Sequence, residues 1–505
     1  MNRINMLLIG LGPHAKRIYF PLLEECHNKL GINLSGLIDL ESQRDKTEDY
    51  LRDKTNQPKL LFVTEEEMSY DVLHPNVERQ LNQLVKSEAI SAVIIATEPL
   101  THVMYAKWAL KSNLSILMDK PVSTYQNVST TSPLAARMLL DYEILQTLYE
   151  KAILANPAIC FSMMAQRRYQ TSFKIIRNLI SECFAKTNCP VTNIQTFHSD
   201  GQWRMPSEMV DQLYHPYMQG YGVCSHSGYH YFDIIPFLME AGLNPEREIN
   251  NVDIFSNFVR PKDLLEQFSF DDYESLFGPD NWLKTNKYSR AEFDSLSGNF
   301  GEVDSFSNLL FKHNYKAITV ASINLCHNGF SDRHWITAHG KDLYHGNGRV
   351  GHETHILQQG PFQTIHFHSY KSKNNTNRPR DVGGKEHLEL YVFRNARMIG
   401  GDPVEIITLD DILEREGSPL GIAGKAKGKA FLDFIAALQG KKTRSEVVSE
   451  FQNAKAAVTI ASGIYQSAAA RMTGENPLIN LPFSLNPNLV TLPTFCATEP
   501  NRSLN

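Results

Sequence analysis

The sequence feature that most constrains the fold is an apolar run that ends in glycines near the start of the chain. Residues 4–12 read INMLLIGLG, and a nearly continuous apolar run is typical of a strand buried on both faces of a parallel sheet. The glycines open GLGPHA at 10–15, which fits the pattern G-x-G-x-x-G/A. A strand, a glycine turn and then a helical pattern predict a dinucleotide-binding βαβ unit, with a glycine turn that holds no ligand as the alternative.

Each position of this motif has a physical reason in such a unit. Gly10 allows the tight turn, Gly12 lets the backbone approach a pyrophosphate, and Ala15 is small enough for close packing of helix on sheet. The helix N-terminus supplies N–H donors and a partial positive charge to the phosphates. The residues that we expect to border the cofactor in this loop are Gly10, Leu11, Gly12, Pro13 and His14.

Asp39 indicates which dinucleotide is bound. It ends the second predicted strand, 34–40, where an acid accepts hydrogen bonds from the adenosine ribose hydroxyls. The same carboxylate would repel a 2′-phosphate, so NAD is favoured over NADP. Arg44 lies close enough in the chain to leave NADP open.

The pattern of strands and helices divides the chain into two main parts. In the first third, helical patterns between predicted strands indicate parallel βαβ units. From about residue 157 the strand candidates are separated by long polar stretches, which favours an antiparallel sheet. We therefore expect an α/β Rossmann domain over 1–155, joined by closing helices at 428–440 and 453–474, an α+β domain with a mostly antiparallel open sheet over 156–485, and a tail over 486–505. The predicted strands of the first part lie at 4–12, 34–40, 59–64, 91–97 and 114–121.

The composition argues against several classes of protein. The chain has 505 residues, of which 42% are hydrophobic and 21% charged, as in ordinary globular proteins. A net charge of −5 without a long basic run gives no footprint for nucleic acid. The first apolar run is too short for a signal segment or a membrane span. Seven irregularly spaced cysteines are typical of reduced intracellular thiols, so we expect a cytoplasmic protein.

Residues 92–123 resemble a stretch of the Gfo/Idh/MocA oxidoreductases, a family that includes glucose–fructose oxidoreductase and inositol dehydrogenase. Ala96-Thr97, Pro99 and His102 match the motif after the family's fourth strand, and Asp119-Lys120-Pro121 stands where the family has E-K-P. Residues 165–169 and 463–482 resemble the opening of its second domain and its closing helix. The resemblance spans the chain, with insertions near 243–300 and 330–400, and implies that Thr97, Pro99, His102, Asp119, Lys120 and Arg167 border the cofactor.

The segment GVCSHSGYHYFD, residues 222–233, is similar to the catalytic segment of that family. Gly228 and His230 match the family's pattern, and His226 stands where the family has Asp. Oxidation of a secondary alcohol needs a base for the hydroxyl proton, and His230 suits this role because histidine titrates near neutral pH. Lys120 would place a positive charge beside the oxygen, where alkoxide character develops.

The other residues of this segment leave several readings open. His226 would hydrogen-bond the substrate or serve the structure alone, and Asp233, one helical turn beyond His230, could orient that imidazole. Because an imidazole replaces an anion at 226, we expect protonated His230 to be disfavoured. A zinc site made by Cys224, His226 and His230 is the alternative, but the sequence offers no evident fourth ligand and the resemblance needs no metal, so we expect none.

Histidines gather in the segment 327–368. His366 and His368 would share one face of a strand, where they could hold a metal, line a polar pocket or lie on a solvated face. Arg167 and Arg168 lie at a strand end, where we expect one to touch the substrate and the other to make a surface ion pair. The segment holds eight of the eighteen histidines of the chain: His327, His334, His339, His345, His352, His355, His366 and His368.

The resemblance implies NAD(P)-dependent transfer of hydride between nicotinamide and a CH–OH group of a sugar, polyol or sugar derivative, with Lys120, His230 and His226 as catalytic groups. One alternative is a nucleotide-binding sensor or scaffold without turnover, because His226 replaces Asp. Another is the reduction of an imine-type substrate. We expect a small-molecule substrate, no nucleic-acid or membrane partner, and a dimer or tetramer formed through the sheet of the second domain.

Overall fold

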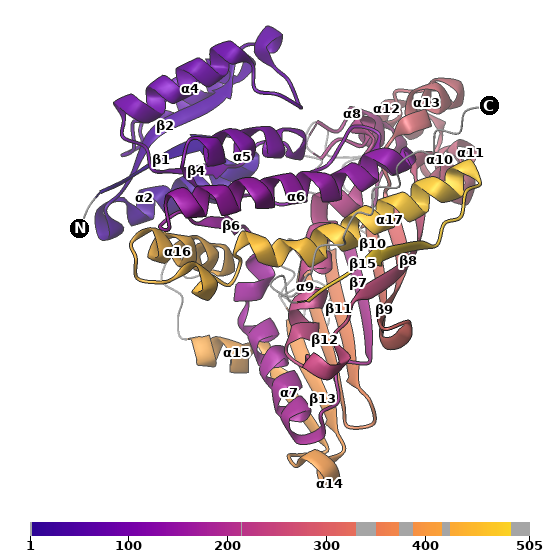
Figure 1. Ribbon diagram of the computed structural model, residues 1–505. Coiled ribbons are helices and arrows are strands. Elements are labelled where there is room, and N and C mark those ends of the chain that lie inside the picture. Colours follow the sequence, from indigo (N-terminus) through magenta and orange to yellow (C-terminus); the bar gives the residue numbers. More distant parts are fainter. Residues whose placement is uncertain (1–2, 214, 330–349, 373–386, 417–424, 486–505) are drawn as a thin grey trace, which may run out of the picture.

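The computed structural model describes residues 3–213, 215–329, 350–372, 387–416 and 425–485. Two β-sheets, joined by long helices, make up the fold (Figure 1). Sheet A has six parallel strands in the order β3-β2-β1-β4-β5-β6. Its strands are β1 (Ile4–Ile9), β2 (Ile32–Leu40), β3 (Lys59–Val63), β4 (Ala92–Ile95), β5 (Ser115–Met118) and β6 (Phe161–Met163).

Helices cover both faces of sheet A, which explains the continuous apolar run at the start of the chain. Met6 and Leu8 pack with α2 (Tyr19–Leu30) and α16 (Ala426–Leu438) on one face. Leu7 and Ile9 pack with helices on the other face, so neighbouring β1 side chains enter opposite cores. The helices of that second face are α4 (Pro75–Ser87), α5 (His102–Lys111) and α6 (Ser132–Ala155).

Two boundaries differ from the sequence expectation. Strand β6 lies beyond the expected end of the Rossmann domain at 155, yet it pairs in parallel with β5. The helical stretch after the glycine loop is broken at Ile18, where φ is −120° and ψ is −65°. It therefore forms α1 (Pro13–Arg17) and α2 as separate helices, and α3 (Arg44–Leu51) follows β2.

Sheet B has nine strands in the order β14-β13-β12-β11-β7-β10-β9-β8-β15. Its pairs are antiparallel except β7 with β10, which run parallel. The fold class expected from the sequence, a Rossmann sheet followed by a mostly antiparallel one, is thus confirmed. The strands are β7 (Asn193–Gln202), β8 (Asn251–Val259), β9 (Asp304–His313), β10 (Lys316–Asn328), β11 (Val350–Gln359), β12 (Gln363–Ser372), β13 (His387–Arg394), β14 (Val404–Thr408) and β15 (Ile479–Pro482).

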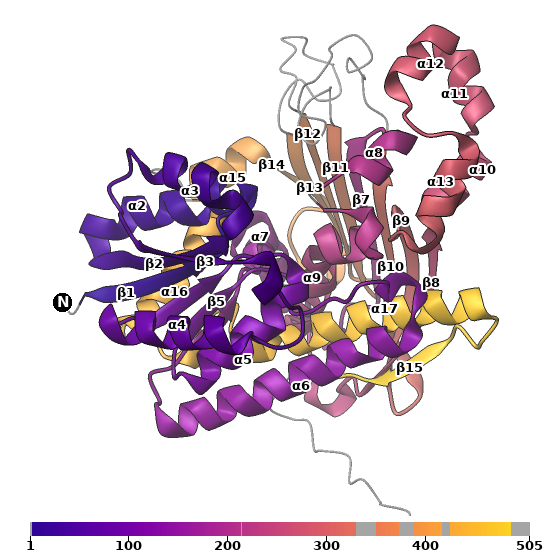
Figure 2. The same ribbon diagram turned by 90° about the horizontal axis from the view of Figure 1, so that it is seen from above.

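Long helices tie the two sheets into one body. Helix α17 (Lys455–Thr473) runs beside α6, and Ser462 Oγ donates a hydrogen bond of 2.7 Å to the carbonyl of Ala135 (Figures 1 and 2). Helices α7 (Thr171–Thr187) and α9 (Tyr229–Glu240) share a core with sheet B. Two shorter helices, α14 (Ala396–Ile399) and α15 (Leu409–Glu416), flank β14.

The stretch near 243–300, expected as an insertion, contributes β8 and a lobe of four short helices that projects at one end of sheet B (Figure 2). Aromatic side chains form its own small core, in which the rings of Tyr273 and Trp282 stack at 5.2 Å. That core continues to Tyr217. The lobe and the helix beside it are α10 (Pro261–Gln267), α11 (Phe270–Phe277), α12 (Pro279–Thr285), α13 (Arg290–Leu296) and α8 (Pro206–Asp211).

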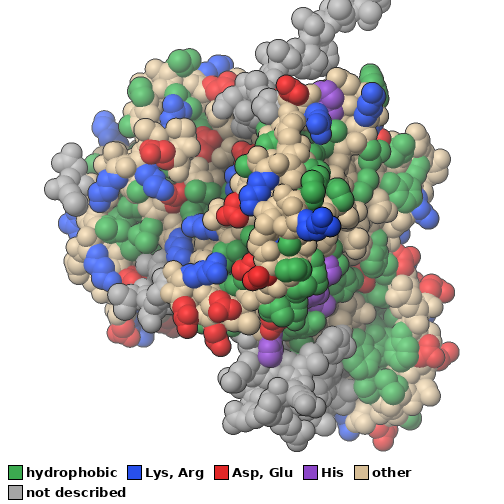
Figure 3. Space-filling view, turned by 90° about the horizontal axis from the view of Figure 1, so that it is seen from below, with side chains coloured by type: hydrophobic (Ala, Val, Ile, Leu, Met, Phe, Trp, Pro, Cys, Tyr) green, Lys and Arg blue, Asp and Glu red, His purple; other side chains and the backbone are tan. Residues whose placement is uncertain are grey.

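The surface of the described residues carries charges of both signs. Basic and acidic side chains are interspersed on the face seen in Figure 3. Among the described helices, none has the length and apolar character needed to cross a membrane.

Candidate active site

The glycine loop fits the close approach of a dinucleotide. Gly10 has φ of +91°, and a Cβ there would lie 3.0 Å from the carbonyl oxygen of Ala96, so this position requires glycine. A Cβ at Gly12 would meet no atom within 4 Å among the described residues, so its backbone faces open space. The loop ends β1 beside β4, where the strand order reverses and dinucleotides bind in such sheets.

Asp39 lies at the end of β2, on the same edge of sheet A as the glycine loop. Its carboxylate accepts hydrogen bonds from the N–H of Leu40 at 2.9 Å and from Thr47 Oγ1 at 2.8 Å. Arg44 is engaged elsewhere, since it donates two hydrogen bonds to Glu41 at 2.6 and 2.7 Å. The carboxylate is thus held in place while the nearby cation is already paired.

His102 joins the loops that follow β4 and β5. Its Nδ1 lies 2.7 Å from the carbonyl oxygen of Pro121, and its Nε2 lies 3.1 Å from that of Thr97. The ring is fully buried, so His102 fixes the two loops relative to each other. Pro99 begins the short turn Pro99–Thr101 between these two contacts.

Lys120 connects the end of β5 to the segment 222–233. Its Nζ donates a hydrogen bond to the main-chain carbonyl of His226, 106 residues further along the chain. Burial lowers the pKa of Lys120, and Arg167 lowers it further, while Asp119 and Glu98 oppose the shift. Two of the three ammonium protons remain for other acceptors.

The segment 222–233 begins with a π-helical turn, Cys224–Gly228, that leads into α9. Such turns occur often at functional sites. The fully buried Glu302 anchors this turn, because its Oε1 accepts hydrogen bonds from the N–H of Cys224 at 2.8 Å and from Tyr465 Oη at 2.9 Å. A Cβ at Gly222 would lie 1.7 Å from the carbonyl oxygen of Glu302, so the two backbones cross in contact.

The buried side chain of His226 is surrounded by other aromatic rings. Its ring centroid lies 4.5 Å from that of His215, 5.3 Å from Tyr221 and 5.6 Å from the stacked ring of His327. Neither ring nitrogen of His226 has a hydrogen-bond partner among the described residues. Burial holds its pKa well below the ordinary value, and the neighbouring His215 and His327 add to this shift. His226 is therefore neutral, with one free donor and one free acceptor.

His230 lies one helical turn beyond His226. Gln166 Nε2 lies 3.4 Å from its Nε2, which is a weak contact. The pKa of His230 is held well below its ordinary value by burial first, then by Arg167 and Lys120. The sequence predicted that protonated His230 is disfavoured, and the pKa does move in that direction. The cause differs from the predicted one, because burial, Arg167 and Lys120 lower this pKa, and the imidazole of His226 does not.

The expectations for Asp233 and Arg168 were wrong. Both oxygens of Asp233 accept hydrogen bonds from Arg168, at 2.9 and 2.7 Å, and both side chains are buried. Asp233 therefore does not orient His230. Arg168 also donates to the carbonyls of Val448 and Asn453 at 3.1 Å each. Its ion pair with Asp233 is therefore buried and links separate segments of the chain, and does not lie on the surface.

Arg167 is also buried, and the second sheet fixes its position. It donates to Glu353 on β11 at 3.0 and 2.6 Å and to Tyr231 Oη at 2.8 Å. His355 Nε2 lies 2.9 Å from Oε1 of Glu353, the same oxygen that accepts from Arg167 Nε. Part of the histidine-rich segment thus positions Arg167, the cation that lowers the pKa of His230 most. The spacing of the histidines alone did not indicate this role.

A lysine from the C-terminal part of the chain, Lys427, also lies in this site, and no sequence motif marks it. Lys427 Nζ lies 3.4 Å from His14 Nε2, and that nitrogen lies 3.4 Å from Asp119 Oδ2. Burial alone would raise the pKa of Asp119, but His14 and Lys120 hold it below the ordinary value. Asp119 is thus an anion among several cations.

The described histidines do not form a metal centre. Among the described residues, no three His, Cys, Asp or Glu side chains are grouped so that they could hold a metal, and Cys224, His226 and His230 form no such group. His366 and His368 lie on β12 with ring centroids 6.0 Å apart. His334, His339 and His345 lie outside the described residues.

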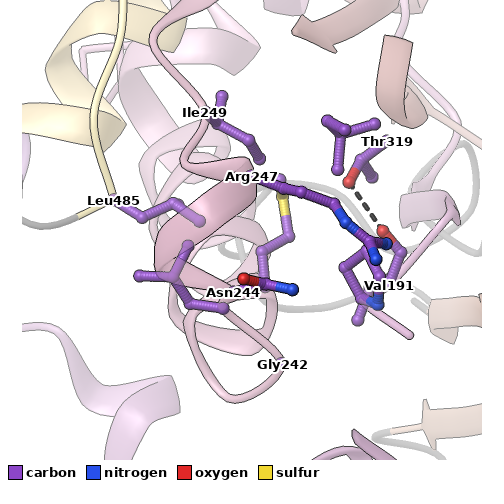
Figure 4. Close-up of a pocket in the computed structure, with 11 residues that line it drawn as sticks. Val191, Gly242, Asn244, Arg247, Ile249, Thr319 and Leu485 are labelled. Atoms are coloured by element: carbon purple, nitrogen blue, oxygen red, sulfur yellow. Dashed lines mark hydrogen bonds between the residues drawn. The ribbon is translucent and has the colours of Figure 1, made fainter. Parts of the chain in front are cut away.

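A small pocket elsewhere in the structure does not belong to this site. Val191, Gly242, Asn244, Arg247, Ile249, Thr319 and Leu485 line it, around a hydrogen bond of 2.6 Å from Thr319 Oγ1 to the carbonyl of Val191 (Figure 4). These residues come from the start of β7, the connection from α9 to β8, β10 and the end of β15. None follows a strand of sheet A, where the site residues gather.

Comparison with known families identifies the first part of the chain. A profile of the Gfo/Idh/MocA oxidoreductase family, described as an NAD-binding Rossmann fold, matches residues 4–139. These residues belong to the Gfo/Idh/MocA oxidoreductases. The family inferred from the motifs is confirmed, and with it an NAD-binding fold and an oxidoreductase. None of the curated proteins matches this sequence.

Solved structures share the fold of this chain over nearly its whole length. An aldose-aldose oxidoreductase from Caulobacter crescentus, complexed with glycerol, is 12% identical, with 95% of this chain and 100% of its own covered and a TM-score of 0.53. An oxidoreductase from Agrobacterium radiobacter, in complex with NAD+, L-tartaric acid and magnesium, is 12% identical, with 95% and 98% covered and a TM-score of 0.54. An oxidoreductase domain protein from Kribbella flavida is 11% identical, with 95% and 99% covered and a TM-score of 0.55. At these identities the likeness concerns the fold.

Proposed function

We propose that the protein is an NAD-dependent oxidoreductase that transfers hydride between nicotinamide and a CH–OH group of a sugar, polyol or sugar derivative. One observation carries the proposal, the hydrogen bond from Lys120 Nζ to the carbonyl of His226. It brings the cation at the end of β5 to the turn that leads into His230, as alcohol oxidation requires. The substrate class is supported by the family resemblance and by a relative of the same fold whose name is aldose-aldose oxidoreductase.

The residues divide the work of alcohol oxidation as follows. When bound, the nicotinamide supplies the hydride acceptor. His230 is neutral because burial and Arg167 depress its pKa, so it can accept the hydroxyl proton. In this proposal the proton goes to Nε2 of His230, which lies 3.4 Å from the amide nitrogen of Gln166. Lys120 directs its remaining N–H donors at the oxygen, where negative charge develops as the proton and hydride leave.

The side chain of His226 is better suited to bind a substrate hydroxyl than to serve only as a packed core residue. A neutral imidazole offers one donor and one acceptor, and a hydroxyl matches both. Buried polar atoms without partners are rare and costly. The two ring nitrogens of His226, which have no partner within the described part of the chain, therefore favour a ligand that completes them. In this proposal His226 orients the substrate and His230 moves the proton.

NAD is proposed over NADP because of two contacts at the end of β2. The Asp39 carboxylate is fixed by Leu40 and Thr47, and it would repel a 2′-phosphate. Arg44, the cation that could offset this repulsion, is held by Glu41.

A second candidate is a nucleotide-binding sensor or scaffold without turnover, and the imidazole at 226 in place of the family's Asp favours it. One experiment separates the two candidates. Binding of NADH to the purified protein is measured by fluorescence, and formation of NADH is then followed with NAD+ and a panel of polyols, aldoses and sugar acids. Turnover with any member supports the oxidoreductase, binding without turnover supports the sensor, and absence of binding contradicts both.

A further inference from the structure

The glycine loop offers fewer donors to a diphosphate than its motif implies. Pro13 occupies the first position of α1 and has no N–H to donate. The helix that follows is only five residues long and ends at Arg17, so it adds little dipole of its own. A diphosphate bound at this loop therefore needs charge or donors from another part of the chain.

Lys427 is placed to supply this charge. It lies in the first turn of α16, which packs against the same face of sheet A as α2. Its Nζ lies 3.4 Å from Nε2 of His14, the second residue of α1. A residue from the C-terminal part of the chain thus touches the first turn after the glycine loop.

The groups around Lys427 carry a surplus of positive charge. Among the described residues, the charged groups that act on it are Lys120 at the end of β5, Arg17 on α1, Arg167 after β6 and the carboxylate of Asp119. His14 adds no charge at neutral pH, since burial lowers its pKa to about 4. Burial, Lys120, Arg17 and Arg167 lower the pKa of Lys427 to about 8, against the opposing effect of Asp119. A bound dianion would offset this surplus.

We propose that Lys427 binds the diphosphate of the dinucleotide and replaces the donor that Pro13 removes from the glycine loop. The inference rests on cofactor binding in the proposed function. It gives the C-terminal helix a direct part in the cofactor site.

A dependence of cofactor affinity on pH follows. Below about pH 8 the free protein carries a charged Lys427, and a bound diphosphate raises the pKa of this lysine further. Affinity for NADH should therefore be full below that pH and fall as the pH rises above it. In a Lys427→Arg variant, whose guanidinium stays charged, affinity should stay level over the same range.

The test compares ligands that differ in phosphate. Dissociation constants of NADH, ADP and uncharged adenosine are measured by calorimetry for the wild type, Lys427→Met and Lys427→Gln. Lys441→Met, an exposed lysine just beyond the C-terminal end of α16, is the matched control. Loss of a hydrogen bond to a charged group predicts binding of NADH and ADP weaker by about tenfold or more, with adenosine unchanged. Melting temperatures show whether each variant is folded.

Three other outcomes would contradict the role of Lys427, its assignment to the diphosphate, or the proposed function. If both folded variants bind ADP and NADH as the wild type does, the inference is wrong. If NADH weakens but ADP does not, Lys427 acts on the nicotinamide half, and the assignment to the diphosphate fails. If the wild type binds neither NADH nor ADP, the proposed function fails, and the inference fails with it.

Discussion

Replacement of Asp233 by Asn tests the buried ion pair between Arg168 and Asp233. Asp233 accepts two hydrogen bonds from Arg168, and the side chains of Arg168 and Asp233 are 6% and 2% exposed. Removal of one partner from a buried ion pair costs about 3–5 kcal/mol, because the other charge stays buried without compensation. Asn keeps one acceptor oxygen, and Arg168 keeps its bonds to the carbonyls of Val448 and Asn453. We therefore expect a loss of about 3 kcal/mol in the free energy of unfolding, the lower end of that range.

The assay is urea denaturation followed by tryptophan fluorescence, with wild type and variant at the same pH. A double variant, Arg168→Met with Asp233→Leu, removes both charges and should recover a large part of the loss. The pH dependence of alcohol oxidation serves as the second readout, since Asp233 does not contact His230. A variant as stable as the wild type to within about 0.5 kcal/mol, with a shifted pH profile, would refute this reasoning.

Three further predictions concern the cofactor, the base and the backbone crossing. Asp39→Ala should narrow the preference for NADH over NADPH in binding titrations, and tighter binding of NADPH by the wild type would contradict the NAD assignment. Because the pKa of His230 is depressed, oxidation should persist below about pH 6.5, where a free histidine becomes protonated; a rate that falls with a midpoint above that value would count against His230 as the base. Gly222→Ala, whose Cβ would press on Glu302 O, should lower the free energy of unfolding by about 1–3 kcal/mol or more. Gly298→Ala, whose Cβ meets no described atom within 4 Å, is the matched control and should leave stability nearly unchanged.

Local patterns in the sequence were sufficient to predict five of the six strands of sheet A and the edge at which the glycine loop lies, whereas β6 was expected in the second domain. The apolar run of β1 faces a core on each side, which is why it lacks polar alternation. Gly10 follows β1 and Asp39 lies near the end of β2. These two strands pair directly, so the order of strands places both residues on one edge. The motifs also brought Lys120 and the segment 222–233 to one site, because both were read through a family pattern.

Local sequence patterns could not predict which distant residues contact the site residues. Asp233 stands one helical turn from His230, and spacing alone suggested that they pair, whereas tertiary packing puts Arg168 against the carboxylate. Glu302 and Lys427 belong to no motif, and they reach the site only through the crossing at Gly222 and the packing of α16. Contacts between distant segments depend on how elements dock, which periodicity does not encode.

The turnover number of Lys120→Ala tests the central claim most directly. The measurement uses saturating NAD+ and a substrate found in the panel, with Lys111→Ala, an exposed lysine on α5, as control. Loss of one preorganised charge at the developing alkoxide predicts a kcat lower by roughly 10²-fold or more. An unchanged kcat with a raised KM would show that Lys120 only binds substrate, and would contradict its proposed catalytic role.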